Sequence, residues 1–262
     1  MTLSSVNLAD IETTLKTKNL IPASCLAIFV GGSLARGWQH ARSDADLYVV
    51  STEPWTGEAD GFNAVALDPA TVPTNSSYLD GRRIEVRYWT DDQIDQLLGK
   101  VTWERFRETD SIGDRINKAE SYLLARLSTA LVVSGVDWID RRREQLADSA
   151  FRPMLTMRAL AVADSYVEDA LGMLESGDQH AAILAAHGAL VAAADALAAN
   201  QGELGVEDKW RARRMAAISS PVLPFDRYWE LTTMRSYDPE QPKRWVEDVL
   251  ELCRTVALEV EI

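Results

Sequence analysis

The spacing of apolar side chains changes near residue 150 and divides the sequence into two parts. Before that point, the short apolar runs CLAIFV (25–30) and DLYVV (46–50) are typical of buried strands. The run FNAVAL (62–67) predicts a further strand. After that point almost every segment has helical composition. The pattern therefore predicts a part that contains a sheet, followed by a helical part.

The segment RRIEVRYW, which ends at Trp89, alternates polar and apolar side chains and predicts a strand with two different faces. One face carries Ile84, Val86 and Tyr88, and the other carries Glu85, Arg87 and Trp89. The preceding stretch PATVPTNSSYLDG contains two prolines, a pair of serines and Asp-Gly, so it predicts a loop.

Helices are expected in the first part at NLADIETTLK, TDDQIDQLL, WERFRE and KAESYLLARLSTALVV. Thr90 or Asp91 is expected to cap the second of these, and Gly135 to end the last. The second part predicts helices at MLTMRALAVADSYVEDALGMLES, DQHAAILAAHGALVAAADALAAN, VEDKWRARRMAAI, DRYWELTTMRS and PKRWVEDVLELCRTVALEV.

Glycine and proline separate these later helices at intervals that suggest an antiparallel bundle. We therefore expect an α+β protein with two domains. Residues 1–150 would form a small mixed sheet with flanking helices, and residues 151–262 would form an all-α bundle.

Composition narrows the class of protein. Of the 262 residues, 47% are hydrophobic and 26% charged, which is a normal globular balance. The N-terminus lacks the features of a signal peptide, and apolar stretches such as ALVAAADALAA are too short to span a bilayer, so a cytoplasmic protein without membrane contact is expected. The net charge of −13 disfavours nucleic-acid binding and favours cationic partners.

Cysteine and histidine offer little chemistry. Cys25 and Cys253 both lie in apolar contexts and are expected to be buried free thiols rather than a disulfide or a reactive site. His187 lies on an apolar helix and is expected to be a core histidine, and the three histidines show no zinc-site spacing.

The stretch VGGSLARGWQHARSDADLYVV, residues 30–50, carries the chemistry. Asp44 and Asp46 stand one residue apart at the start of a predicted strand, where side chains at i and i+2 point the same way. Two like charges so close need a cation between them, and Mg²⁺ prefers such carboxylates together with phosphate oxygens. Gly31-Gly32-Ser33 allows a phosphate to approach the backbone closely. Glu85 could supply a third acid.

Glycines, paired acids and a third acid together form the set that brings a nucleoside triphosphate and metal ions together for in-line displacement. The other common phosphate loops, GxxxxGK[ST] and GxGxxG, do not occur in the sequence. The alternative is a glycine turn followed by a solvated polar turn.

GGSLARGWQHARSDADL resembles the signature of the DNA polymerase β-like nucleotidyltransferase superfamily, in particular the branch with the aminoglycoside nucleotidyltransferases and minimal nucleotidyltransferases. The resemblance implies that Asp44 and Asp46 hold Mg²⁺ and that Gly32 and Ser33 hold the triphosphate of ATP. It makes Glu85 a metal ligand or the general base that acts on the acceptor hydroxyl.

The helical part is similar in layout to the second domain of the streptomycin/spectinomycin adenylyltransferases. By position, that resemblance implies that Asp178 and Trp103 contact the substrate, and that Lys209 and Tyr237 contact the nucleotide. Arg36 and Arg42 flank the glycine stretch and could neutralise phosphate charge, although arginines are also common on solvated loops. The run 141–143 of three arginines is expected to be a solvated helix face.

The sequence thus predicts an Mg²⁺-dependent enzyme that moves AMP from ATP to a hydroxyl of a small cationic acceptor, such as an aminoglycoside antibiotic. Two alternatives stay open: an enzyme that adenylylates a protein, as in toxin–antitoxin pairs, and a non-catalytic nucleotide sensor. The acceptor, the preferred base, the role of Glu85 and the choice between monomer and homodimer are left undecided by the sequence.

Overall fold

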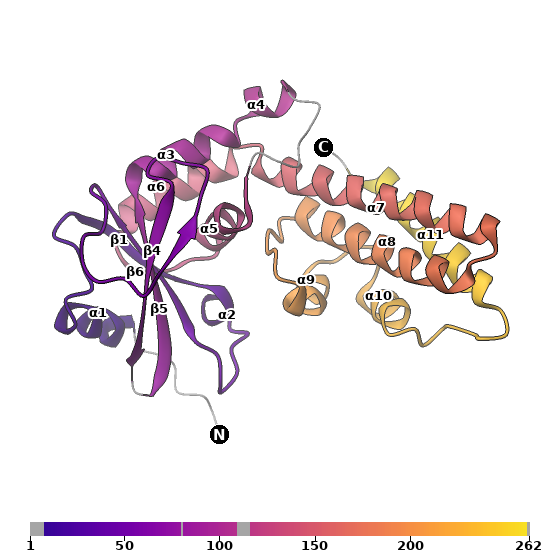
Figure 1. Ribbon diagram of the computed structural model, residues 1–262, viewed down its shortest axis with the longest axis horizontal. Coiled ribbons are helices and arrows are strands. Elements are labelled where there is room, and N and C mark those ends of the chain that lie inside the picture. Colours follow the sequence, from indigo (N-terminus) through magenta and orange to yellow (C-terminus); the bar gives the residue numbers. More distant parts are fainter. Residues whose placement is uncertain (1–7, 80, 109–115, 261–262) are drawn as a thin grey trace. The chain divides into compact units, whose positions relative to one another are not determined.

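The computed structural model describes residues 8–79, 81–108 and 116–260. The chain divides between Ser149 and Ala150 into two compact units, one residue before the predicted boundary. The first unit contains the sheet, and the second contains only helical elements and their connections among the described residues (Figure 1). The fold class is therefore α+β, as predicted.

The described strands of the first unit form one sheet in the order β3-β4-β5-β2-β1-β6. Their bounds are β1 (Cys25–Gly31), β2 (Ala45–Ser51), β3 (Gly61–Ala64), β4 (Thr71–Leu79), β5 (Arg82–Thr90) and β6 (Leu131–Ser134). β2 and β5 run parallel, and the other neighbours run antiparallel. The central parallel pair places two distant segments of the sequence in direct contact.

The two faces of this sheet differ in chemistry. Helix α1 (Leu8–Thr17) packs Ile11 and Leu15 against apolar side chains of one face, including Leu47 and Val86. The opposite face carries Tyr48 and is contacted by α5 (Lys118–Ser128). The unit also contains α2 (Gly32–Ala35), α3 (Asp91–Lys100), α4 (Trp103–Arg107) and α6 (Val136–Ala147). The predicted alternation of residues 84–89 is confirmed, because the apolar set faces α1.

Two segments differ from the sequence-based expectation. The predicted loop 69–81 contains β4, in which Val72 is fully buried between β3 and β5. The long helix predicted at 118–133 ends at Ser128, and Leu131–Ser134 form the strand β6 beside β1. The β-branched residues Val132 and Val133 favour a strand where a neighbouring strand is available for pairing.

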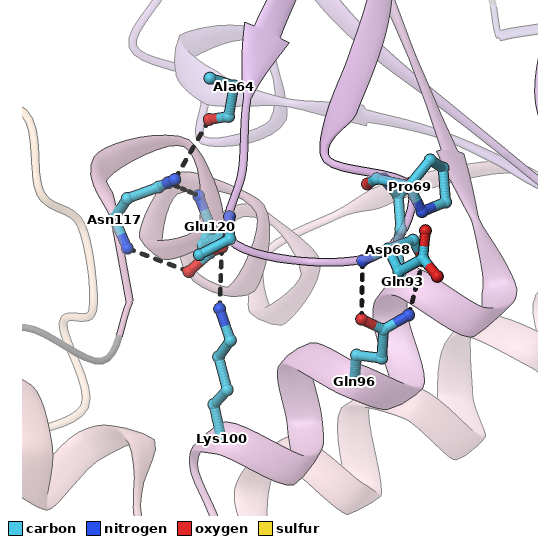
Figure 2. A network of polar contacts seen from close by, with 9 residues as sticks. Ala64, Asp68, Pro69, Gln93, Gln96, Lys100, Asn117 and Glu120 are labelled. Carbon is cyan, nitrogen blue, oxygen red and sulfur yellow. Dashed lines mark hydrogen bonds and ion pairs between the residues drawn. The ribbon is translucent and has the colours of Figure 1, made fainter.

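A buried carboxylate fixes the start of α5 (Figure 2). Glu120 is fully buried and accepts hydrogen bonds from the backbone N–H of Ala66 at 2.8 Å and of Asn117 at 3.0 Å. Lys100 Nζ lies 3.0 Å from the same carboxylate, and the Asn117 amide donates to the Ala64 carbonyl at 3.1 Å. The N-terminus of α5 is therefore held against the end of β3.

A second pair of contacts holds the connection from β3 to β4 on α3 (Figure 2). Gln96 exchanges two backbone hydrogen bonds with Asp68, at 2.8 and 2.6 Å. Gln93 donates to the Pro69 carbonyl at 2.6 Å and forms a capping box with Thr90. The predicted cap at Thr90 is confirmed.

The second unit consists of α7 (Phe151–Ser176), α8 (Gln179–Asn200), a 3₁₀ turn η1 (Asp208–Trp210), α9 (Arg211–Ala217), α10 (Phe225–Thr232) and α11 (Pro242–Glu259). Figure 1 shows α7, α8 and α11 running side by side. The alanine-rich α8 lies in the core, which small side chains allow by letting neighbouring helices approach closely. By length and composition α8 could cross a membrane, but 67% of its most apolar window is buried inside the structure, as in a core helix.

Candidate functional site

The parallel pairing of β2 with β5 brings two of the predicted acids together. Asp46 and Glu85 are direct partners across these strands, and Gly31 of β1 is the partner of Asp46 on its other side. Directly opposed residues on neighbouring strands project from the same face of a sheet. Asp46 and Glu85 therefore lie side by side on one face of the sheet, next to the glycine bend.

A guanidinium lies between the two carboxylates. Arg87 Nη1 is 2.8 Å from Asp46 Oδ1, and Arg87 Nη2 is 3.1 Å from Glu85 Oε1. Arg126 of α5 adds a longer contact, with Nη2 3.5 Å from Asp46 Oδ2. The side chains of Arg87 and Asp46 are only 17% and 14% exposed, so water screens their attraction weakly. The repulsion between the two acids is thus compensated by residues of the same unit.

Burial by itself would lower the pKa of Arg87, but the negative charges of Asp46 and Glu85 oppose this, and its pKa lies above the ordinary value. The phenol of Tyr48 stacks on Phe29 with ring centroids 4.8 Å apart and accepts a hydrogen bond from Arg126. Burial raises the pKa of Tyr48 against the opposing influence of the two arginines, so this phenol stays neutral.

The glycine bend is shaped to fit the carboxylate. Gly32 has a φ of +66°, and a Cβ placed there would lie 2.3 Å from Asp46 Oδ2. Only glycine leaves room for this oxygen beside the backbone. Ser33 follows in the short helix α2, and Arg36 at the end of that helix places its guanidinium 3.7 Å from the ring centroid of Trp38. Arg42 is exposed, in the turn before β2.

Asp44, the other acid of the predicted pair, stands outside strand β2. Asp44 is half-buried and precedes β2, and among the described residues no group of three or more His, Cys, Asp or Glu side chains is placed to hold a metal ion. Mg²⁺ in nucleotide sites is commonly bound by one or two carboxylates plus phosphate oxygens. Asp46 and Glu85, beside a bend that admits close approach, fit that donor set. A three-acid metal centre stays a prediction.

Trp103 lies in a different part of the first unit. It begins α4, is 39% exposed, and its indole Nε1 donates to the Asp148 carbonyl at 3.0 Å. It lines a cavity of about 490 Å³ formed with residues such as Asp95 and Gln145. None of the lining residues is an acid of the β2–β5 pair. Its predicted contact with substrate stays a prediction.

The other predicted contact residues belong to the helical unit. Asp178 is the N-cap of α8 and accepts a hydrogen bond from the Ala181 backbone at 3.0 Å. Lys209 is exposed in η1, with Nζ 5.6 Å from the ring centroid of Trp210. Tyr237 packs edge-on against Trp245. Each has a structural contact of its own, and their roles toward substrate and nucleotide stay predictions.

The expectation of buried free thiols is confirmed for Cys253 but not for Cys25, which is unbridged and only half-buried. His187, expected in the core, is half-buried with Nε2 3.3 Å from a backbone carbonyl. The arginine run of α6 is not a solvated face, because Arg142 is 6% exposed and pairs with the carboxylates of Asp91 and Asp95 on α3.

Sequence reasoning missed the roles of Arg87 and Arg126. The alternation of β5 already placed Arg87 on the same face as Glu85, two residues away, and that spacing could have identified it. Arg126 lies on α5 and reaches Asp46 only through the packing of that helix on the sheet. No local pattern in the sequence indicates such a contact.

Comparison with known proteins addresses the fold. No family model and no curated protein matches the sequence. Among solved structures, the chain is similar to a nucleotidyltransferase-like protein from Exiguobacterium sibiricum 255-15, with a TM-score of 0.51 and 12% sequence identity. The similarity covers 96% of this chain and 74% of that one. The chain therefore has a nucleotidyltransferase-like fold, in which the paired acids and the glycine bend lie on one face of the central sheet.

Proposed function

We propose that this protein is a nucleotidyltransferase that moves AMP from ATP to a hydroxyl group of a small acceptor. The observation that carries the proposal is the direct pairing of Asp46 with Glu85 beside the bend at Gly32. The similarity of fold agrees with it. Two acids next to a glycine bend are suited to phosphoryl chemistry, where positioning and charge neutralisation supply most of the catalysis.

In the proposed reaction, the backbone of Gly32 and Ser33 binds the triphosphate. The acceptor hydroxyl loses its proton to Glu85 or a nearby carboxylate, and its oxygen forms a bond to the α-phosphorus. The bond from that phosphorus to the β-phosphate oxygen breaks, and pyrophosphate leaves. Asp44 and Asp46, with Glu85 where it does not act as the base, would hold Mg²⁺, which when bound neutralises charge on the triphosphate. Arg87 would then give up its contacts with both acids.

The predicted cationic acceptor, such as an aminoglycoside, is supported by the net charge of −13. In this form of the proposal Trp103 and Asp178 contact the acceptor, and Lys209, Arg36 and Tyr237 contact ATP. Adenylylation of a protein is the alternative within the same chemistry.

A non-catalytic nucleotide sensor is a second candidate, favoured by one specific observation. Arg87 already pairs with both acids, through a hydrogen bond of 2.8 Å to Asp46 and an ion-pair contact of 3.1 Å to Glu85. A protein that kept this arrangement when loaded with nucleotide would bind ATP without transferring any part of it.

Pyrophosphate release from Mg²⁺-ATP, measured across aminoglycosides, anionic acceptors and cell lysate, separates these candidates. We expect the wild type to release pyrophosphate. Asp46→Asn should lower the rate of release by more than roughly 100-fold, because loss of a residue that only supports a metal ligand already costs up to that much. Asp10→Asn, an exposed acid on α1, is the control of equal charge change and should keep the rate.

Calorimetric titration with ATP accompanies the rate assay. ATP binding by the wild type without pyrophosphate release from any acceptor would establish the sensor. Full activity of Asp46→Asn with an unchanged melting temperature would contradict the assignment of Asp46. Absence of both binding and release would refute a nucleotide function of either kind.

A further inference from the structure

A cavity of about 420 Å³ lies directly beside the acid pair. The two arginines that contact Asp46, Arg87 and Arg126, also line this cavity. Its other walls come from β2, β3, the end of β5 and the first turns of α5. The volume falls in the range of small-molecule sites. Because Glu120 and Lys100 hold the start of α5 in place, the wall is preformed.

The charge of this cavity is positive. Arg87, Lys118 and Arg126 line it, and none of the described residues that line it is a carboxylate. Among the described residues, the adjacent acids Asp46 and Glu85 contact Arg87, and Asp46 also contacts Arg126. Lys118 is exposed and forms no ion pair with any residue that the structure describes. Its ammonium group lies 5.6 Å from the ring centroid of Tyr122 and could also reach an anionic ligand in the cavity.

Aromatic surface and an unused donor complete the cavity. Tyr48, Trp89 and Tyr122 are among its lining residues, and aromatic walls suit a planar group in the ligand. Trp89 is only 2% exposed, and its indole Nε1 has no hydrogen-bond partner within the described part of the chain. A buried donor without a partner is costly, so a ligand acceptor would satisfy it. Asn63 and Asn117 add amide groups to the lining.

The local charge outweighs the overall charge for a ligand in contact with these residues. The net charge of −13 acts over distance, but salt reduces such interactions beyond about 8 Å at physiological ionic strength. Direct contacts with guanidinium and ammonium groups inside a partly dehydrated cavity are screened much less. A cationic acceptor in this cavity would face three positive side chains.

The register of the strands places the cavity and the glycine bend on different sides of the acids. Gly31 on β1 is the partner of Asp46, and the bend follows it. The cavity lies further along β2 and β5, where Tyr48 is the partner of Arg87. With the triphosphate at the bend, a group in the cavity would reach the acids from a different direction, along the strands rather than across them.

We infer that this cavity is the acceptor site, and that the acceptor is a small organic anion with an aromatic ring, in place of a cation. That the ligand is an acceptor depends on the proposed nucleotidyl transfer. That the ligand is an anion with a ring is inferred from the cavity alone.

Matched probes test the charge directly. Calorimetry would compare para-hydroxybenzylphosphonate, para-hydroxybenzyl alcohol and tyramine, which share a ring and differ in charge. Each is titrated into the full chain with and without saturating α,β-methylene-ATP and Mg²⁺. We expect the phosphonate to bind at least about tenfold more tightly than the alcohol, tyramine to bind most weakly, and the phosphonate to bind together with the ATP analogue.

Lys118→Glu should weaken phosphonate binding at least about tenfold and leave binding of the ATP analogue unchanged. Lys118 begins α5, where a negative side chain is favourable to the helix, so the variant should fold. Lys18→Glu changes the net charge equally at an exposed position outside this cavity, and it should bind the phosphonate like the wild type.

Three results would overturn the inference: tighter binding of tyramine than of the phosphonate, equal losses in both lysine variants, or competition between the phosphonate and the ATP analogue. The first two remove the local charge argument, and the third assigns the cavity to the nucleotide. If the wild type binds the phosphonate but not the ATP analogue, the proposed transfer fails while the anion site stands.

Discussion

Two glycines with the same backbone conformation offer a controlled test of the site geometry. Gly32 and Gly37 have φ values of +66° and +65°. Alanine at either position would adopt the left-handed region at a cost of about 1–2 kcal/mol. A Cβ at Gly37 has no neighbour within 4 Å, whereas one at Gly32 would lie 2.3 Å from Asp46 Oδ2. The difference between Gly32→Ala and Gly37→Ala therefore isolates the contact with the carboxylate.

The magnitude follows from what Asp46 would lose. To clear the new methyl group, Asp46 Oδ2 must move away from its 3.5 Å contact with Arg126, and rotation of the carboxylate also disturbs the 2.8 Å hydrogen bond that Oδ1 accepts from Arg87. Hydrogen bonds to charged groups are worth about 1.5–3 kcal/mol. We expect Gly37→Ala to lower the free energy of unfolding by about 1–2 kcal/mol and Gly32→Ala by roughly 2.5–5 kcal/mol.

Urea unfolding of both variants and calorimetric titration with Mg²⁺ and α,β-methylene-ATP are the measurements. Gly32→Ala should lose nucleotide affinity even where it is still folded, because Asp46 is displaced and the bend is filled. Gly37→Ala should keep that affinity. Equal losses of stability in the two variants, or nucleotide binding by Gly32→Ala at the wild-type affinity, would refute the geometry on which the proposed function depends.

Two further predictions concern the rest of the molecule. Arg142→Met should lower the free energy of unfolding by about 2 kcal/mol in a urea titration. This is less than the usual cost of breaking a buried ion pair, because the partner Asp95 is 61% exposed. Arg141→Met, on the exposed face of the same helix, should change the free energy of unfolding by less than about 0.5 kcal/mol. Burial raises the pKa of Cys253 to about 12, so near pH 8 its thiol is protonated and should resist a disulfide reagent until guanidinium unfolds the protein. Peptide mapping would show this, and rapid labelling of Cys253 in the native protein would contradict it.

Local chemistry in the sequence anticipated much of the fold. Thr90 caps α3 through a capping box with Gln93, and Gly177 ends α7 in the left-handed conformation, at a φ of +82°. Such signals depend only on neighbouring residues. The strands β4 and β6 were missed because their stability comes from partners elsewhere: polar, proline-containing β4 lies between two strands, and β6 pairs with β1. Pairing across the sheet prevailed over local preference.

The candidate site shows the same division between local and distant information. The glycine bend and Asp46 were identified because they lie close together in a recognisable pattern. The structural partnership of Asp46 with Glu85 depends on parallel pairing of strands separated by β3 and β4 in the sequence. The contribution of Arg126 depends further on how α5 packs on that face. Neither fact can be obtained from residue types and spacing alone.

The register of β5 against β2 connects the stability of the fold with the chemistry of the site. A slip by one residue would exchange the two faces of β5 and carry Glu85, Arg87 and Trp89 into the core against α1. It would also expose Ile84, Val86 and Tyr88, which are at most 2% exposed. Because burial of each such side chain is worth about 1.5–3 kcal/mol, the apolar face fixes the register. The same packing therefore places the acid pair, its arginine and the cavity on the opposite face.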